Sequence, residues 1–186
     1  MLIFSIRSAL RCAGLCSREQ ALHFISGNRL RNFVLDRTLE KCSYLTKSGE
    51  RKEAYRFTEA GKQWVREHID SLSEHKYYHS IAVEHDLRLM DKIISLTREQ
   101  RETMRCENEI RDDFKERMQT YLDNRDYERY DQLYTAMQTH TVSMPDLCIG
   151  ENEFYEVITS SYSQEIIECK VSLALAVGGT IQMDRI

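Results

Sequence analysis

The sequence of residues 27–61 is GNRLRNFVLDRTLEKCSYLTKSGERKEAYRFTEAG. Its first part has apolar residues close to helical spacing, which predicts a helix over about 29–41 with one buried face: Leu30, Phe33, Val34 and Leu39. Two strand-like runs follow, over 43–46 and 53–58, and Ser48-Gly49 between them supplies a turn. Thr58 can accept a hydrogen bond from a free backbone N–H and so begin another helix. The stretch therefore predicts a helix, a β-hairpin and a second helix.

Polar and cationic side chains cluster on the first helix and on the hairpin. The helix carries Arg29, Arg31, Asn32 and Arg37, and the hairpin carries Lys47, Arg51, Lys52 and Arg56. Arg and Asn match the edges of guanine and adenine in the major groove, whereas a cationic hairpin binds the phosphate backbone or the minor groove. This combination predicts a winged helix-turn-helix domain over residues 1–72 that binds double-stranded DNA. Further helices are expected over 3–11 and from a cap at Ser17. The run AYRFTEAGKQWV resembles the second wing strand and closing helix of winged-helix regulators.

Composition and charge indicate two modules in a soluble globular protein. Hydrophobic residues make up 41% and charged residues 30% of 186 positions, and no apolar run approaches the roughly 18 residues that span a bilayer. Residues 1–75 hold 13 Lys and Arg against 9 Asp and Glu, whereas the remainder holds 13 against 21. The basic front half is therefore expected to contact phosphates. Six cysteines without a CxxC pair indicate reduced thiols, a cytoplasmic location and no zinc site.

The rear half, residues 78–186, is expected to be an α+β module. Amphipathic patterns predict helices over 81–96 and 98–122. Strands are expected over 144–149 and 153–159, followed by a helix over 163–177 and a last strand over 180–183. The predicted fold class is thus α+β, with an N-terminal winged helix followed by a small α+β module.

Asp146 and Glu156 lie on the two strands of the predicted hairpin. Paired strands bring such carboxylates within several ångströms of each other, which suits Mg²⁺ or Mn²⁺. The pattern resembles the PD-(D/E)xK nuclease core, because Pro145-Asp146 and Glu156 match its acidic positions. Its lysine is missing, since the position two beyond Glu156 is Ile158. The resemblance implies that Lys170 on the following helix replaces it, and that Glu107 or Glu109 is the helix carboxylate.

A second resemblance covers most of the chain. The order of its motifs is similar to that of the replication-relaxation family of mobile elements. These motifs are the winged helix, His85-Asp86-Leu87, a charged helix with Glu107 or Glu109, Pro145-Asp146, Glu156 and Lys170. That resemblance implies a double-stranded DNA-binding protein of a plasmid or integrative element, acting in regulation, replication or transfer. DNA binding would require no cofactor. The rear module would be a degenerate nuclease-like unit that serves partner binding or homodimerisation.

Two other functions are compatible with the sequence. The first is a metal-dependent DNA nuclease in which Asp146 and Glu156 hold Mg²⁺ or Mn²⁺ and Lys170 assists catalysis. The second is a protein-interaction factor whose acidic rear half blocks a host nucleic-acid enzyme. Neither the DNA target nor the oligomeric state follows from the residues.

Overall fold

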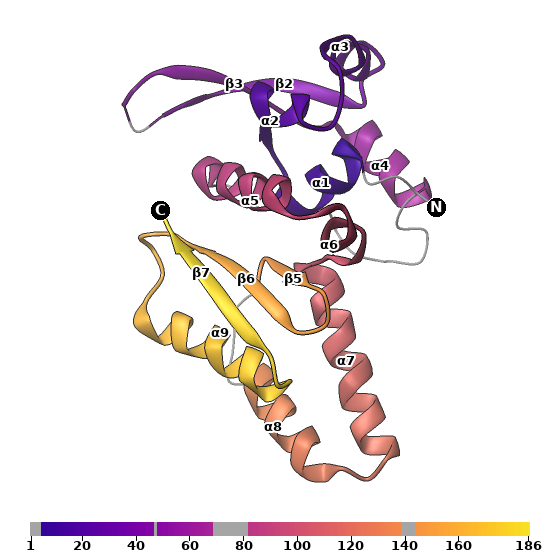
Figure 1. Cartoon of the computed structure of the whole chain (residues 1–186), viewed down its shortest axis with the longest axis vertical. Coiled ribbons are helices and arrows are strands. Elements are labelled where there is room, and N and C mark those ends of the chain that lie inside the picture. The colour runs from indigo at the N-terminus through magenta and orange to yellow at the C-terminus, as the bar shows by residue number, and fades with distance from the viewer. Residues whose placement is uncertain (1–4, 47, 69–81, 139–143) are drawn as a thin grey trace. The chain divides into compact units, whose positions relative to one another are not determined.

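The computed structural model describes residues 5–46, 48–68, 82–138 and 144–186. The chain is a mixed α+β protein with two sheets, and it divides into a front unit, Met1–Glu102, and a rear unit, Thr103–Ile186 (Figure 1). Helix α5, which the sequence analysis assigns to the rear module, packs in the front unit. Its buried apolar residues Leu89, Met90 and Ile93 contribute to this packing, and the Gln20 amide donates to Leu87 O at 2.8 Å and to Asp91 Oδ1 at 2.7 Å on that helix.

The front unit combines a three-stranded sheet with helices. Its elements are α1 (Ile6–Ala13), β1 (Cys16–Ser17), α2 (Arg18–Leu22), α3 (Gly27–Leu35), β2 (Leu39–Leu45), β3 (Arg51–Phe57), α4 (Glu59–His68), α5 (Val83–Ser95) and α6 (Arg98–Thr103). The strand order is β1-β3-β2, and both pairings are antiparallel. Helix α3, the β2–β3 hairpin and helix α4 are the elements predicted from residues 27–61, whereas strand β1 and the central position of β3 in the sheet were not predicted.

Local signals explain most of these elements. Ser17 caps α2 in a capping box with Gln20, and Ser26 caps α3. The predicted helix over 29–41 is too long, because α3 ends at Leu35 and β2 begins at Leu39. Asp36 accepts a hydrogen bond from the Thr38 N–H, and the backbone between them turns left-handed. That turn prevents the next residues from continuing the helix.

The rear unit consists of one sheet and three long helices. Its elements are β4 (Arg105–Cys106), α7 (Glu107–Asp123), α8 (Tyr127–Gln138), β5 (Leu147–Ile149), β6 (Glu153–Ile158), α9 (Gln164–Ala176) and β7 (Thr180–Arg185). The strand order is β4-β5-β6-β7, antiparallel except for the parallel pair β6–β7, which α9 connects. The helix expected over 98–122 is divided into α6 and α7, because Glu109 accepts a hydrogen bond from Cys106 N–H and begins a new helix there.

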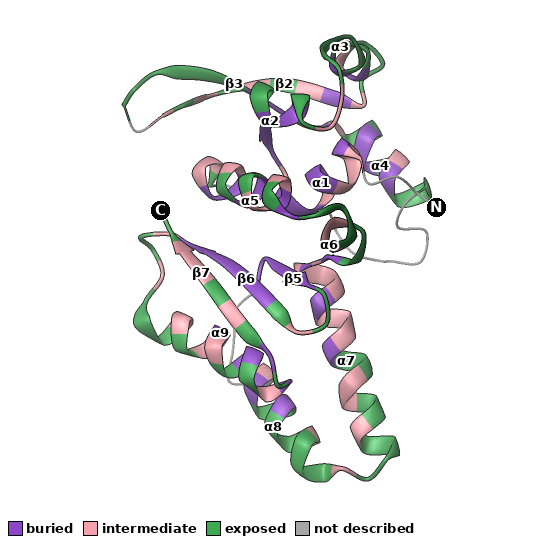
Figure 2. Ribbon diagram, viewed as in Figure 1, coloured by how far each residue is buried: buried purple, intermediate pink, exposed green. Residues whose placement is uncertain are grey.

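The rear core lies between the helices and the sheet. It is built around Ile110 and Phe114 of α7, Leu133 of α8, Phe154 of β6 and Leu173 of α9. Strand β6 is buried from Phe154 to Ile158, and Figure 2 shows this continuous buried run. A strand buried on both faces suits a central position in its sheet. Among the described residues, no helix has the length and apolar character required to cross a bilayer.

Candidate nucleic-acid interface and buried ion cluster

Helix α3 presents a polar outer face. Leu30 and Phe33 are buried and anchor the helix, whereas Arg29, Arg31 and Asn32 are exposed. Figure 2 shows that much of the α3 ribbon is exposed. Within the described part of the chain, neither Arg29 nor Arg31 is ion-paired with a carboxylate. Their charges are therefore available to a ligand outside the protein.

Arg7 supports this helix from behind, a role that the sequence analysis missed. Its guanidinium lies 4.6 Å from the centre of the Phe33 ring on α3 and 3.6 Å from that of Trp64 on α4. These are cation–π distances. Burial lowers the pKa of Arg7, and nearby Arg29 lowers it further, whereas Asp36 opposes the shift. An arginine among apolar residues of a short helix is the one sequence signal that points to such a role.

Arg37 does not lie on helix α3, contrary to the prediction. It follows the end of α3 with a left-handed φ of 61° and an exposed side chain. Its carbonyl accepts a hydrogen bond from the Thr58 hydroxyl, which joins this corner to the start of α4. Arg37 is thus placed at the corner between α3 and β2.

The β2–β3 hairpin is the predicted wing, and its cations are mostly paired with acids of the same hairpin. Lys52 Nζ lies 3.5 Å from Glu50 Oε2, and Arg56 Nε lies 2.6 Å from Glu40 Oε1. Arg51 Nε instead donates to Ser43 Oγ at 3.1 Å. Arg51 and Arg56 are five residues apart in one strand and so point to opposite faces of it. Lys41 forms a further pair with Glu53. Lys47 lies outside the described residues.

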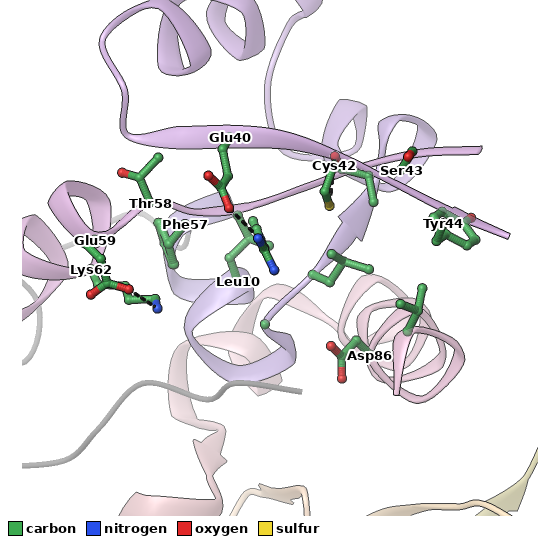
Figure 3. Close-up of a pocket in the computed structure, with 15 residues that line it drawn as sticks. Leu10, Glu40, Cys42, Ser43, Tyr44, Phe57, Thr58, Glu59, Lys62 and Asp86 are labelled. Atoms are coloured by element: carbon green, nitrogen blue, oxygen red, sulfur yellow. Dashed lines mark hydrogen bonds and ion pairs between the residues drawn. The ribbon is translucent and has the colours of Figure 1, made fainter. Parts of the chain in front are cut away.

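A cavity of about 350 Å³ lies on the sheet face where Arg56 points (Figure 3). Its apolar lining includes Leu10 and Leu15 from α1 and the loop after it, and Ala54 from β3. Two ion pairs also line it: Arg56 with Glu40, and Lys62 with Glu59 at 2.6 Å. Arg56 is therefore directed toward this cavity and away from the strand face that carries Arg51.

In the rear unit, the structure brings Asp146, Glu156 and Lys170 together. Lys170 Nζ lies 2.7 Å from Glu156 Oε1 and donates to Met144 O at 3.0 Å. The Asp146 backbone N–H donates to Glu156 Oε2 at 3.1 Å, and Asp146 Oδ2 accepts from Val157 N–H at 2.8 Å. The Tyr162 hydroxyl donates to Glu156 Oε1 at 2.8 Å. We call Asp146, Glu156 and Lys170 the ion cluster.

The ion cluster is almost completely enclosed. The exposed fractions are 8% for Asp146, 0% for Glu156 and 2% for Lys170. Burial raises the pKa of Glu156 to about 7, with the Asp146 charge as the next cause, while Lys170 and the hydrogen bonds to Glu156 act in the opposite direction. Burial also raises the pKa of Glu107, which interacts electrostatically with Lys170 and Asp146. Of the two predicted helix carboxylates, Glu107 therefore belongs near the cluster.

The ion cluster does not fit a Mg²⁺ or Mn²⁺ site. Both ions prefer oxygen ligands, and Mg²⁺ retains several waters. Here both oxygens of Glu156 already accept hydrogen bonds, and the Lys170 ammonium lies where a cation would bind that carboxylate. In the described part of the chain, no group of three or more His, Cys, Asp or Glu side chains is arranged to hold a metal.

The His85-Asp86 motif lies in α5 of the front unit. His85 Nδ1 is 3.3 Å from Asp86 Oδ1, and both side chains are buried. The motif and the ion cluster therefore belong to different units of the chain.

No protein-family model and no curated protein matches the chain. A solved structure with some similarity is the crystal structure of Bacillus subtilis PadR in complex with operator DNA, at 16% sequence identity and a TM-score of 0.25, with 92% of this chain and 88% of that chain covered. Similarity at this level assigns neither fold nor function.

Proposed function

We propose that the protein binds double-stranded DNA through its front unit, with α3 in the major groove. The observation that carries this proposal is the exposed side of α3, where Arg29, Arg31 and Asn32 are spread around the part of the helix surface that Leu30 and Phe33 do not bury. Arginine can donate two hydrogen bonds to guanine, and asparagine can pair with adenine. These three side chains would therefore read bases or fix the register of the helix.

The wing and the corner after α3 would contact the sugar-phosphate backbone. Arg51 on β3 and Arg37 at the corner are exposed and have no carboxylate partner within the described residues. Lys52 and Arg56 would first have to leave their pairs with Glu50 and Glu40. Because such exposed pairs are worth about 0–1 kcal/mol, phosphate can compete for these cations. Lys47 remains a predicted contact of the wing tip.

The rear unit would serve as a non-catalytic module for partner binding or dimerisation. The enclosure of Glu156 and Lys170 supports this role, because a scissile phosphate must reach the groups that act on it. The setting in a mobile genetic element, with a task in regulation, replication or transfer, is supported by the resemblance of the short motifs alone.

Fluorescence anisotropy with a random 30-base-pair duplex in EDTA and low salt tests DNA binding. We expect Arg29→Glu/Arg31→Glu to abolish it, while a matched reversal on the rear unit, Lys115→Glu/Arg129→Glu, leaves at least a third of the affinity. If about four phosphates are neutralised, log K should fall against log salt with a slope of about −3.6. The variant Arg29→Lys/Arg31→Lys distinguishes base contacts from phosphate contacts, because lysine keeps the charge of arginine but loses its bidentate geometry.

The outcomes are distinct. Equal loss in both reversed variants would mean that net charge alone drives binding and that α3 has no special role. No binding by the parent protein would reject the proposal and favour the alternative in which the front unit contacts a protein.

A metal-dependent nuclease is the alternative function, because Asp146, Glu156 and Lys170 converge in the structure, although the Lys170 ammonium takes the place of a cation on Glu156. It predicts that Mn²⁺ supports cleavage of supercoiled plasmid and that Asp146→Ala abolishes it. Plasmid that stays intact at micromolar protein, in either metal, would eliminate this candidate.

A further inference from the structure

A groove of about 880 Å³ runs between α8 and α9 of the rear unit, which are neighbours in Figure 1. Its floor contains small side chains, among them Ala136, Cys169 and Ser172. Three exposed carboxylates line it: Asp131 from α8, and Glu165 and Glu168 from α9. A floor of small residues allows another backbone to approach closely.

The outer face of α9 has two different ends. Glu165 and Glu168 lie in its first two turns, whereas the groove surface of its last turn is Leu175 and Ala176. Leu175 is 65% exposed. A helix on the surface of a soluble protein normally has a polar outer face. The only cation of α9, Lys170, is buried in the ion cluster and does not balance the outer carboxylates.

The charge of the groove restricts what it can bind. No Lys or Arg lines it in the described chain, and none of its three carboxylates is ion-paired there. A nucleic-acid backbone would be repelled. The same face of a second copy would place carboxylates either against carboxylates or, with the α9 helices antiparallel, against Leu175, and in neither arrangement would a cation of this groove pair with them. A ligand that fits must bring cations to one end and an apolar group to the other.

We propose that the α8–α9 groove binds a basic amphipathic helix of a partner protein. The partner's Lys or Arg side chains would face Asp131, Glu165 and Glu168, and an apolar side chain would cover Leu175. Glu168 and Leu175 are seven residues apart, about 10 Å along α9, so the partner's cations and its apolar anchor would lie about two helical turns apart. The inference gives the partner-binding part of the proposed function a site and does not depend on DNA binding.

A displayed library of 16-residue helical peptides tests this site with the full-length protein as bait. Four positions on one face of each peptide vary among Lys, Glu, Leu, Ala and Ser. We expect enrichment of peptides with Lys at one end of that face and Leu at the other. The bait Glu165→Lys/Glu168→Lys should reverse the choice and enrich Glu at the same positions.

The control bait Glu116→Lys/Glu128→Lys changes the net charge equally at exposed positions outside the groove, and it should keep the selection for Lys. For the best Lys peptide, we expect the groove variant to weaken binding at least tenfold, and the control less than threefold. Leu175→Ser should weaken it severalfold. Circular dichroism confirms that each variant is folded before it is compared.

Several results would overturn the inference. They are an absence of enrichment with the parent protein, a preference for Lys that survives in the groove variant, or an equal loss in the control. Sedimentation showing a dimer that Leu175→Ser dissociates would assign the face to a second copy instead. Binding of the DNA duplex is measured on the same variants. If the parent protein does not bind the duplex, that result contradicts the proposed DNA binding and leaves the groove inference unaffected.

Discussion

Replacing Lys170 with methionine should strongly destabilise the rear unit. The substitution keeps the length and volume of the side chain but removes an ammonium 2.7 Å from Glu156, a carboxylate that is 0% exposed. Removing one partner of a buried ion pair typically reduces stability by about 3–5 kcal/mol, because the remaining charge is left unpaired. For a domain of this size, each kcal/mol lowers Tm by about 4–8 °C, so a decrease of more than about 10 °C is expected.

The effect should depend on pH in a defined direction. Burial raises the folded-state pKa of Glu156 from 4.5 to about 7, so between these values the folded protein binds this proton more tightly than the unfolded protein does. The stabilisation of the folded protein by this bound proton is fully present below about pH 4.5 and is lost as the pH rises through about 7. In Lys170→Met, a protonated Glu156 needs no counter-ion. The decrease in Tm should therefore be larger at pH 8 than at pH 5.5.

Differential scanning calorimetry at both pH values measures the effect. Lys115→Met is the matched control, because that lysine lies on α7 with 59% of its side chain exposed, and its replacement should change stability by less than about 0.5 kcal/mol. Adding Glu156→Gln to Lys170→Met removes the unpaired charge and should recover part of the loss at pH 8. A decrease below 2 °C at pH 8, or one independent of pH, would refute a buried structural ion pair and reopen the catalytic role.

Two further predictions concern the front unit, each read from thermal unfolding. Gly61→Ala should destabilise it by about 1–3 kcal/mol, because an added Cβ would lie 2.0 Å from Thr38 O, a backbone atom that cannot shift without moving the chain. In Gly27→Ala, where the atom nearest to an added Cβ is 3.9 Å away, the change should be neutral or stabilising by up to about 1 kcal/mol. A stability change of the same sign at both glycines would contradict this reasoning. Ser17→Ala should reduce stability by about 1 kcal/mol through loss of the cap on α2, whereas Ser17→Asp should retain most of it.

Elements with strong local signals could be predicted from the sequence. The turn at Ser48-Gly49 separates two strands that pair in register from Leu39 with Phe57 to Leu45 with Arg51. Strand β6, helix α9 and strand β7 lie within a few residues of their predicted positions. In each case a turn or a cap interrupts the apolar pattern, and the interruption marks the boundary.

Boundaries without such a signal were predicted wrongly. Leu39 has helical spacing from the apolar residues of α3, but it also begins an alternating strand pattern, LEKCSYL, and periodicity alone does not choose between the two. The left-handed turn occurs at Arg37, and the sequence has no glycine there that would indicate such a turn. The packing of α5 in the front unit includes hydrogen bonds from Gln20 to residues about 70 positions away, and no local pattern encodes such a contact.

The ion cluster shows a different limit of sequence reasoning. Pro145-Asp146, Glu156 and a nearby lysine predict that carboxylates and an ammonium converge, and they do. The same residue types, however, serve both a metal site and an internal ion pair, and the sequence does not state how far they are from solvent. The position of the lysine distinguishes an internal ion pair from a metal site. Ile158 occupies the strand position, while Lys170 extends from α9 and places its ammonium on Glu156 itself. A cation of the protein thus neutralises this carboxylate, which favours a structural role for the cluster over a catalytic one.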